Sequence, residues 1–301
     1  MTPPRPRERE LHVRGATLAY RLWPGADPDR VLVLLHGFAS NGTRWQRFAT
    51  DSRLRGHWSI LCPDLRGHGR SVWRGRLRSE DWVADLAAIL DAEGFDRAAV
   101  GGHCLGANTA LHFAHRHPGR TSALVLVEPL EPGALVGRLG RLRRLRGLLP
   151  WFAAVVRAGN ALGLRRRQLP VLDLAELDRQ TRTAIAETGD ERALTARYGS
   201  IRHDLHYMAT AAYMQALGEV VRPLPPLAGI AAPALALLSS GGLFGDPRAT
   251  RERMAELPGV QLEEIDARHW IPTEQPRLMA EHIDRWLLGD AGREAEMNTH
   301  G

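Results

Sequence analysis

A cysteine at position 104 occupies a pentapeptide that could present a nucleophile. Residues 102–106 read GHCLG and lie between a stretch typical of a strand and a stretch typical of a helix. A sharp strand-to-helix turn lifts its central side chain above the sheet, and the flanking residues must be small because the backbone folds tightly there. The helix N-terminus supplies free N–H groups and the positive end of its dipole, which favour a reactive thiolate. We therefore interpret Cys104 as a candidate nucleophile rather than as an inert buried cysteine.

Candidates for the other two members of a catalytic triad follow along the chain. His269 lies in a loop after the last predicted strand, from which a general base can reach the nucleophile. Asp246 comes between Cys104 and His269 and could hold the imidazole in its working orientation. A proline follows Asp246, and this pair is also typical of a helix start. Glu128, at the end of another predicted strand, is the alternate acid because it could reach the same histidine.

Two backbone N–H groups are candidates for an oxyanion hole. Phe38 belongs to the turn of residues 36–38 (HGF), directly after a strongly apolar run, and would point its N–H toward the nucleophile. Leu105, the residue after Cys104, would supply the second donor. An ordinary glycine turn is the alternative interpretation of residues 36–38.

The other histidines do not predict a metal or a cofactor. His203 and His206 form the nearest approach to a ligand pair, but no further ligand pattern accompanies them. His36, His68 and His103 are better interpreted as structural or turn residues. We therefore expect neither a metal site nor a cofactor.

Alternating strands and helices have to position these residues. Apolar runs of β type are followed by stretches of helical periodicity, which predicts βαβ units and a parallel sheet. The predicted strands are residues 31–35, 59–62, 98–101, 123–127, 234–238 and 261–265, and the clearest core helices are 82–91 and 276–288. Residues 1–10 are highly charged and are expected to form a disordered tail, and the residues after 289 are expected to fray.

Residues 130–225 interrupt this alternation. They lack strand-like runs and predict helices around residues 139–156, 174–187, 191–200 and 204–221. We interpret them as a helical cap or lid inserted into a core of residues 1–129 and 226–289, with 290–301 as a C-terminal tail. Within residues 138–149, leucines alternate with arginines, which favours an amphipathic helix whose leucines face the core. A lid that meets a membrane surface or an anionic acyl carrier is the alternative.

The bulk composition limits the class of protein. The chain has 301 residues, 44% of them hydrophobic, and a net charge of +6, and all 40 of its basic residues are arginine. These arginines are not confined to one module and no nucleic-acid-binding pattern is present, so we expect no nucleic-acid partner. Two cysteines, Cys62 and Cys104, make no disulfide framework. Without an apolar leader or a spanning run, we expect a cytoplasmic protein that is not integral to a membrane.

Taken together, these residues resemble the α/β-hydrolase superfamily. The segments that carry the resemblance are LLHGFAS (34–40), PDLRGHGRS (63–71), GHCLGA (102–107), LVLVEP (124–129) and RHWIPTEQP (268–276). The resemblance implies an α/β fold with a mostly parallel eight-stranded sheet and a helical cap insertion. It places the family's nucleophile on Cys104, its histidine on His269 and its acid on Asp246. Cysteine replaces the usual serine, and Leu243 and Phe244 stand about where the acid is expected, which keeps Glu128 as the alternate acid.

The functional hypothesis is a hydrolase that acts on an ester, thioester or lactone through a covalent acyl-cysteine intermediate and a Cys-His-Asp triad. The expected substrate is a small acyl compound with an apolar portion, which could be delivered on an acyl carrier protein or as a CoA ester. Transfer of the acyl group to an alcohol or amine, by an acyltransferase or cyclase, is the first alternative. A lyase that uses His269 as its base, and a non-catalytic accessory protein, are the others.

Overall fold

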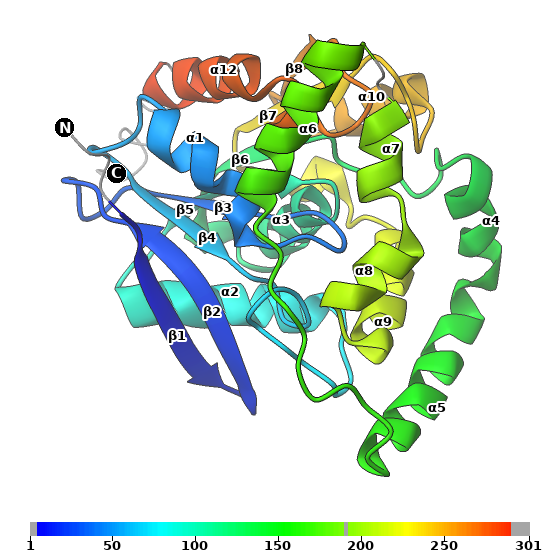
Figure 1. Ribbon diagram of the computed structural model, residues 1–301. Helices are drawn as coiled ribbons and strands as arrows, with labels where there is room; N and C mark the ends of the chain where they lie inside the picture. Colours follow the sequence, from blue (N-terminus) through cyan, green and yellow to red (C-terminus); the bar gives the residue numbers. More distant parts are fainter. Residues whose placement is uncertain (1–4, 190–191, 290–301) are drawn as a thin grey trace.

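The computed structural model describes residues 5–189 and 192–289 and contains one eight-stranded sheet in that part of the chain (Figure 1). The strand order is β1-β2-β4-β3-β5-β6-β7-β8. Neighbouring strands from β4 through β8 pair in parallel, whereas β1 with β2 and β2 with β4 pair antiparallel. The strands are β1 (Arg7–Val13), β2 (Ala16–Trp23), β3 (Val31–Leu35), β4 (Ser59–Pro63), β5 (Ala98–His103), β6 (Thr121–Val127), β7 (Ala234–Ser239) and β8 (Gln261–Ile265). The predicted mostly parallel eight-stranded sheet is confirmed.

The disordered N-terminal tail predicted for residues 1–10 is wrong for residues 7–10, which belong to β1, and residues 1–4 lie outside the described residues. β1 is an edge strand whose polar side chains remain largely in solvent, which explains its charged sequence. Two of these charges are paired, since Arg70 donates to Glu8 at 2.6 Å and to Glu10 at 2.8 Å. β2, almost entirely buried, also lies outside the predicted strands.

Helices cover both faces of the sheet. Alternate side chains of β3 face opposite layers: Val33 and Leu35 join one apolar cluster, while Leu32 and Leu34 join the other. This burial on both sides explains the continuous apolar runs of the central strands. The core helices are η1 (Gly42–Trp45), α1 (Gln46–Asp51), α2 (Ser79–Glu93), α3 (Leu105–Arg116), η2 (Pro118–Arg120), η4 (Leu227–Gly229), α10 (Pro247–Met254), α11 (Ile271–Glu274) and α12 (Pro276–Leu288). In Figure 1, α1 and α12 lie above the sheet and α2 below it.

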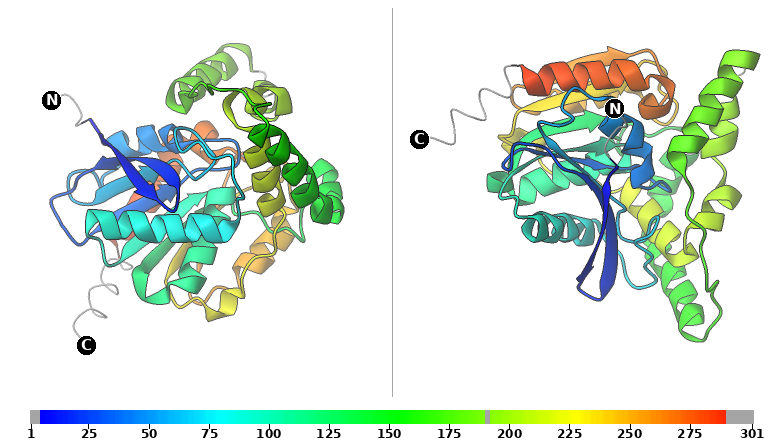
Figure 2. Two further views of the ribbon diagram at one scale, coloured as in Figure 1. Left: turned by 90° about the horizontal axis from the view of Figure 1, so that it is seen from below. Right: turned by 60° about the vertical axis from the view of Figure 1, so that its left-hand side comes forward.

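The described residues between β6 and β7 form six α-helices and two 3-10 turns, and we call all of these except η4 the inserted helices. They are α4 (Gly137–Leu145), η3 (Arg146–Leu148), α5 (Leu149–Ala161), α6 (Leu174–Thr188), α7 (Arg192–Tyr198), α8 (Ile201–Tyr207) and α9 (Thr210–Val220). Figure 2 shows them gathered along one side of the molecule. None of the helices in the described part of the chain combines the length and the apolar character needed to cross a membrane.

Two of the predicted cap helices are broken in the structure. The helix predicted over residues 139–156 is divided into α4, η3 and α5, and Pro150, which has no N–H to donate, stands in the first turn of α5. The helix predicted over residues 204–221 is divided where Met208 adopts an extended backbone. The expectation that the leucines of residues 138–149 face the core holds for Leu139 and Leu142, which pack against it, and is wrong for Leu145 and Leu148, which are half-exposed.

Candidate active site

Cys104 lies at the turn from β5 to α3 with a backbone that only glycine adopts easily. Its φ is 56° and its ψ is −116°, and its N–H donates to the carbonyl of Val127 at 3.0 Å. The small flanking residues are needed: a Cβ at Gly102 would lie 2.5 Å from the carbonyl oxygen of Leu35, and one at Gly106 would meet the same carbonyl. Close backbone packing therefore fixes the buried thiol at the carboxyl edge of the sheet.

His269 lies between Cys104 and Glu128. Its Nδ1 is 3.6 Å from Oε1 of Glu128, and its imidazole interacts electrostatically with the side chains of both residues. Burial disfavours the charged imidazole, but the interactions with the side chains of Cys104 and Glu128 outweigh it and raise the pKa of His269 to about 9. The arrangement therefore favours the imidazolium form of His269 at neutral pH.

Glu128 reaches His269 from the end of β6. Its backbone has a φ of 49°, and its N–H donates to the carbonyl of Leu237 at 2.8 Å. One carboxylate oxygen accepts the N–H of Ser239 at 2.6 Å, which leaves the other to face the imidazole. Contacts with β7 thus fix the direction of this carboxylate.

Asp246 occupies a different place. It is the N-cap of α10, where its carboxylate accepts the N–H of Arg248 at 2.9 Å. Among the contacts of the described residues, none joins Asp246 to His269; Phe244 packs edge-on against the imidazole instead, with ring centroids 4.6 Å apart. The structure brings together Cys104, His269 and the alternate acid Glu128, and it separates the first-choice acid from them because Asp246 caps a helix.

The turn of residues 36–38 lies directly beside Cys104, the candidate nucleophile. A Cβ at Gly37 would be 3.4 Å from Cβ of Cys104, so the backbone passes close to the thiol. His36 braces this turn: its Nε2 accepts the N–H of Leu65 at 3.0 Å, and its Nδ1 is 2.8 Å from the carbonyl of Gly37. This bonding matches its interpretation as a structural histidine.

Two further residues hold the loop that carries His269. Glu274 accepts the N–H groups of Arg268, His269 and Trp270 at 2.9, 3.1 and 2.7 Å. The Nε2 atom of His103 is 2.9 Å from the carbonyl oxygen of His269. Glu274 was not among the predicted site residues, although a carboxylate so soon after a candidate catalytic histidine and just before a helix is a detectable signal.

A cavity of about 440 Å³ lies over Cys104, between the core and the inserted helices. Its lining is mainly apolar and comes from both parts: Phe38, Leu130, Val136, Leu139, Leu142, Leu217, Val220, Leu243, Phe244 and Trp270. The polar exceptions include Asp204, whose pKa burial raises to about 7 in spite of its hydrogen bond with Tyr213. Such a cavity suits a largely apolar ligand with few polar groups.

A buried ion pair joins the inserted helices to the core at one side of this cavity. Arg44 of η1 donates to Asp178 of α6 at 2.6 Å, and both side chains are almost completely buried. The hydroxyl of Tyr198 donates to the same carboxylate at 2.6 Å, and its ring lies 4.8 Å from the Arg44 guanidinium. This pair anchors α6 over η1.

Comparison with known proteins places this geometry in a family. The sequence model of the alpha/beta hydrolase fold matches residues 30–276. The lipase LipV of Mycobacterium tuberculosis is 39% identical over 102 residues, which are 34% of this chain and 38% of that protein. A monoacylglycerol lipase of Mycolicibacterium smegmatis is 34% identical over 128 residues, which are 39% of this chain and 44% of that protein. The chain therefore spans less than half the length of these curated relatives.

Solved structures agree on the fold. The enol-lactonase from Burkholderia xenovorans LB400 superposes with a TM-score of 0.68 at 19% identity, covering 93% of this chain and 100% of that one. A thermophilic esterase from Thermogutta terrifontis gives 0.66 at 21% identity, covering 96% and 99%. With a family match that extends over residues 30–276, the chain belongs to the alpha/beta hydrolase fold family.

Proposed function

We propose that this protein hydrolyses an ester, thioester or lactone through a covalent acyl intermediate on Cys104. The observation that carries the proposal is the placement of His269 between Cys104 and Glu128, with Nδ1 3.6 Å from the Glu128 carboxylate, beneath an apolar cavity. In this proposal the triad is Cys104, His269 and Glu128, and Asp246 is a helix cap.

The acylation step follows from this geometry. The Cys104 thiolate attacks the substrate carbonyl carbon, and the carbonyl π electrons move to the oxygen, which the N–H groups of Phe38 and Leu105 hold. When the tetrahedral intermediate collapses, the bond to the leaving group breaks and the His269 imidazolium gives that group its proton. Glu128 stabilises the imidazolium and fixes its orientation.

Deacylation reverses these roles with water. Neutral His269 takes a proton from a water molecule as its oxygen attacks the acyl carbon, and the Cys104 sulfur then leaves as a thiolate. The products are a carboxylic acid and the original thiolate–imidazolium pair. An alcohol or amine in place of water would make the same enzyme an acyltransferase, so the acceptor decides between these outcomes.

Two features support an apolar acyl substrate. The cavity over Cys104 is lined mainly by leucine, valine and aromatic side chains. The curated relatives include proteins named as a lipase and a monoacylglycerol lipase. In this proposal the inserted helices are a cap that closes the acyl site, with residues 1–129 and 226–289 as the catalytic core.

The test is pre-steady-state kinetics with p-nitrophenyl esters of increasing acyl length. Wild type should release a burst of p-nitrophenol of about one equivalent per active site, and Cys104→Ala should release none. Cys104→Ser, which keeps a nucleophile, is the matched control for folding and substrate binding. A Cys104→Ala variant that turns over substrate like wild type would reject the covalent mechanism and favour a lyase or base mechanism that uses His269 alone.

A further inference from the structure

The segment of residues 136–171 forms an arm along one edge of the molecule. It contains α4, η3 and α5 and the chain that follows them, and α4 and α5 lie at the right-hand margin of Figure 1. One flank of α5 packs on α9, where Ala153 is completely buried. The opposite flank of α5 faces outward.

The outward flank of this arm is apolar. Trp151, Val155 and Leu162 are 63%, 54% and 82% exposed, and Leu148 and Phe152 are about half-exposed. Their spacing of three, four and seven residues puts them on one helical stripe. Nine of the twelve large apolar side chains that are exposed in the described residues lie in the arm: Val136, Leu145, Leu148, Trp151, Phe152, Val155, Leu162, Leu164 and Val171. An apolar surface so concentrated marks an interaction site.

The arm is also strongly basic. Between Glu131 and Asp173 the chain contains nine arginines and no acidic residue. Eight of the nine are exposed, and they lie on α4, on η3 and in the chain after α5: Arg138, Arg141, Arg143, Arg144, Arg146, Arg165, Arg166 and Arg167. This charge opposes pairing with a second copy of the same arm and complements an anionic partner.

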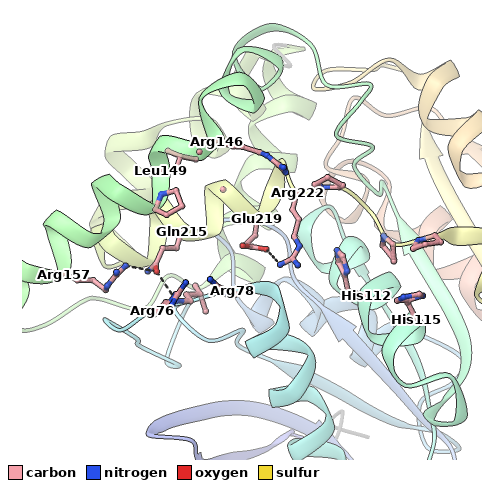
Figure 3. Close-up of a pocket in the computed structure, with 17 residues that line it drawn as sticks. Arg76, Arg78, His112, His115, Arg146, Leu149, Arg157, Gln215, Glu219 and Arg222 are labelled. Atoms are coloured by element: carbon pink, nitrogen blue, oxygen red, sulfur yellow. Dashed lines mark hydrogen bonds and ion pairs between the residues drawn. The ribbon is translucent and has the colours of Figure 1, made fainter.

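A basic pocket extends this charge onto the core (Figure 3). It has a volume of about 840 Å³ and lies between the arm and the ends of α2, α3 and α9. Its arginines are Arg76, Arg78, Arg146, Arg157 and Arg222. Arg222 is paired with Glu80 and Glu219, and Arg157 donates to Gln215, but the other arginines add positive charge beside the arm.

We propose that the arm docks on the surface of a lipid bilayer that contains anionic phospholipid. A surface helix with exposed tryptophan, phenylalanine and leucine on one side and arginines around it suits the boundary between headgroups and acyl chains. Trp151 and Phe152, whose rings are in contact at a centroid distance of 5.0 Å, enter this boundary first. The arginines lie among the anionic headgroups.

Docking there would place the cavity of Cys104 beside the bilayer. Val136, Leu139 and Leu142 of the arm also line that cavity. An apolar acyl substrate could therefore pass from the membrane to Cys104 along the inner side of α4. This route rests on the proposed function, whereas membrane docking itself does not.

The experiment is vesicle flotation of the full chain with two lipid compositions, phosphatidylcholine alone and phosphatidylcholine with phosphatidylglycerol. Wild type should bind the anionic vesicles at least about tenfold more tightly than the neutral ones. The double variant Trp151→Ser/Phe152→Ser should lose at least about tenfold of this binding. Leu278→Ser, which removes an exposed leucine of α12 outside the arm, is the matched control and should bind like wild type.

Three outcomes would overturn the proposal. One is equal binding by wild type and the double variant, and another is no binding to either lipid. The third is a dimer of wild type, in sedimentation velocity without lipid, that the double variant abolishes, because the stripe would then bind a second copy. Cys104→Ala is tested in parallel and should float like wild type. The test of membrane docking is therefore independent of the proposed acyl-cysteine mechanism.

Discussion

Glu128 Oε1 lies 3.6 Å from His269 Nδ1, and the carboxylate is fixed there by the N–H of Ser239. In the proposed triad the acid therefore comes from the end of β6 rather than from the loop after β7. The ring of Phe244 packs edge-on against the same imidazole, with centroids 4.6 Å apart, and gives it an apolar neighbour beside the Glu128 carboxylate. This placement predicts different effects for substitutions of the two candidate acids, Glu128 and Asp246.

Glu128→Gln should reduce kcat/KM for an ester on the order of 10³-fold, because the neutral amide no longer stabilises the imidazolium or its tautomer. Asp246→Asn should stay close to wild type, since asparagine can still cap α10. Steady-state kinetics of the two isosteric variants make the comparison. A large loss in Asp246→Asn with little loss in Glu128→Gln would assign the acid to Asp246.

The rate of acylation by alkyl esters should fall as the pH rises through about 9. His269 has a raised pKa of about 9, so its imidazolium is present below that pH and disappears above it, and with it the proton for the leaving group. Glu128→Gln removes a charge that raises this pKa, so the alkaline limb should move to lower pH. Pre-steady-state rates from pH 5 to 10.5 make the measurement, and an identical limb in both proteins would contradict the role of Glu128.

Raising the pKa of His269 also links stability to pH. A folded-state pKa of about 9 above the ordinary 6.5 contributes stability that is fully present below pH 6.5 and is lost as the pH rises through 9. His269→Gln should remove this part of the pH dependence. Urea unfolding at pH 6 and pH 9.5 measures it, and the prediction fails if the two proteins lose the same stability over that interval.

Gly106→Ala should destabilise the fold by about 1–3 kcal/mol, because its Cβ would meet the carbonyl groups of Leu35 and His36. Gly119→Ala is the matched control, since no atom lies within 4 Å of the position of its Cβ. Thermal unfolding compares the two. Equal melting temperatures would mean that the turn at Cys104 relaxes without cost.

Asp178→Asn should cost about 3–5 kcal/mol of stability, because it leaves the buried guanidinium of Arg44 without its counter-ion. The double variant Arg44→Met/Asp178→Leu should recover most of that loss, since apolar side chains of similar size remove both charges. Urea unfolding of the three proteins measures this. A double variant less stable than Asp178→Asn would indicate that the pair itself stabilises the attachment of α6.

The sequence predicts those parts of the fold that are buried on two sides. The sequence pattern correctly predicts the continuous apolar run as the buried strand β3. It also correctly predicts the glycine-flanked turn at Cys104. β1 was missed because an edge strand needs only pairing with β2, and its charged side chains resemble those of a disordered segment.

The acid could not be chosen from sequence because two carboxylates follow neighbouring strands. The local hydrogen bonds of each carboxylate decide which one can face His269. Asp246 caps α10 by accepting the N–H of Arg248, whereas Glu128 accepts the N–H of Ser239 and keeps its other oxygen toward His269. The exposure of the apolar stripe on α5 could not be predicted from the sequence either. Helical periodicity identifies an apolar face of a helix but does not show whether that face is buried.

The most direct test of the account is intact-mass spectrometry after brief exposure to aryl esters and acyl thioesters. Wild type should gain an acyl mass that is absent from Cys104→Ala. The adduct should form more slowly in Glu128→Gln and at the wild-type rate in Asp246→Asn. The lifetime of the adduct in water, and its shortening by added alcohol or amine, would separate hydrolysis from acyl transfer. An adduct that persists in Cys104→Ala, or a wild-type thiol that neither acylates nor reacts with alkylating agents, would contradict the covalent mechanism.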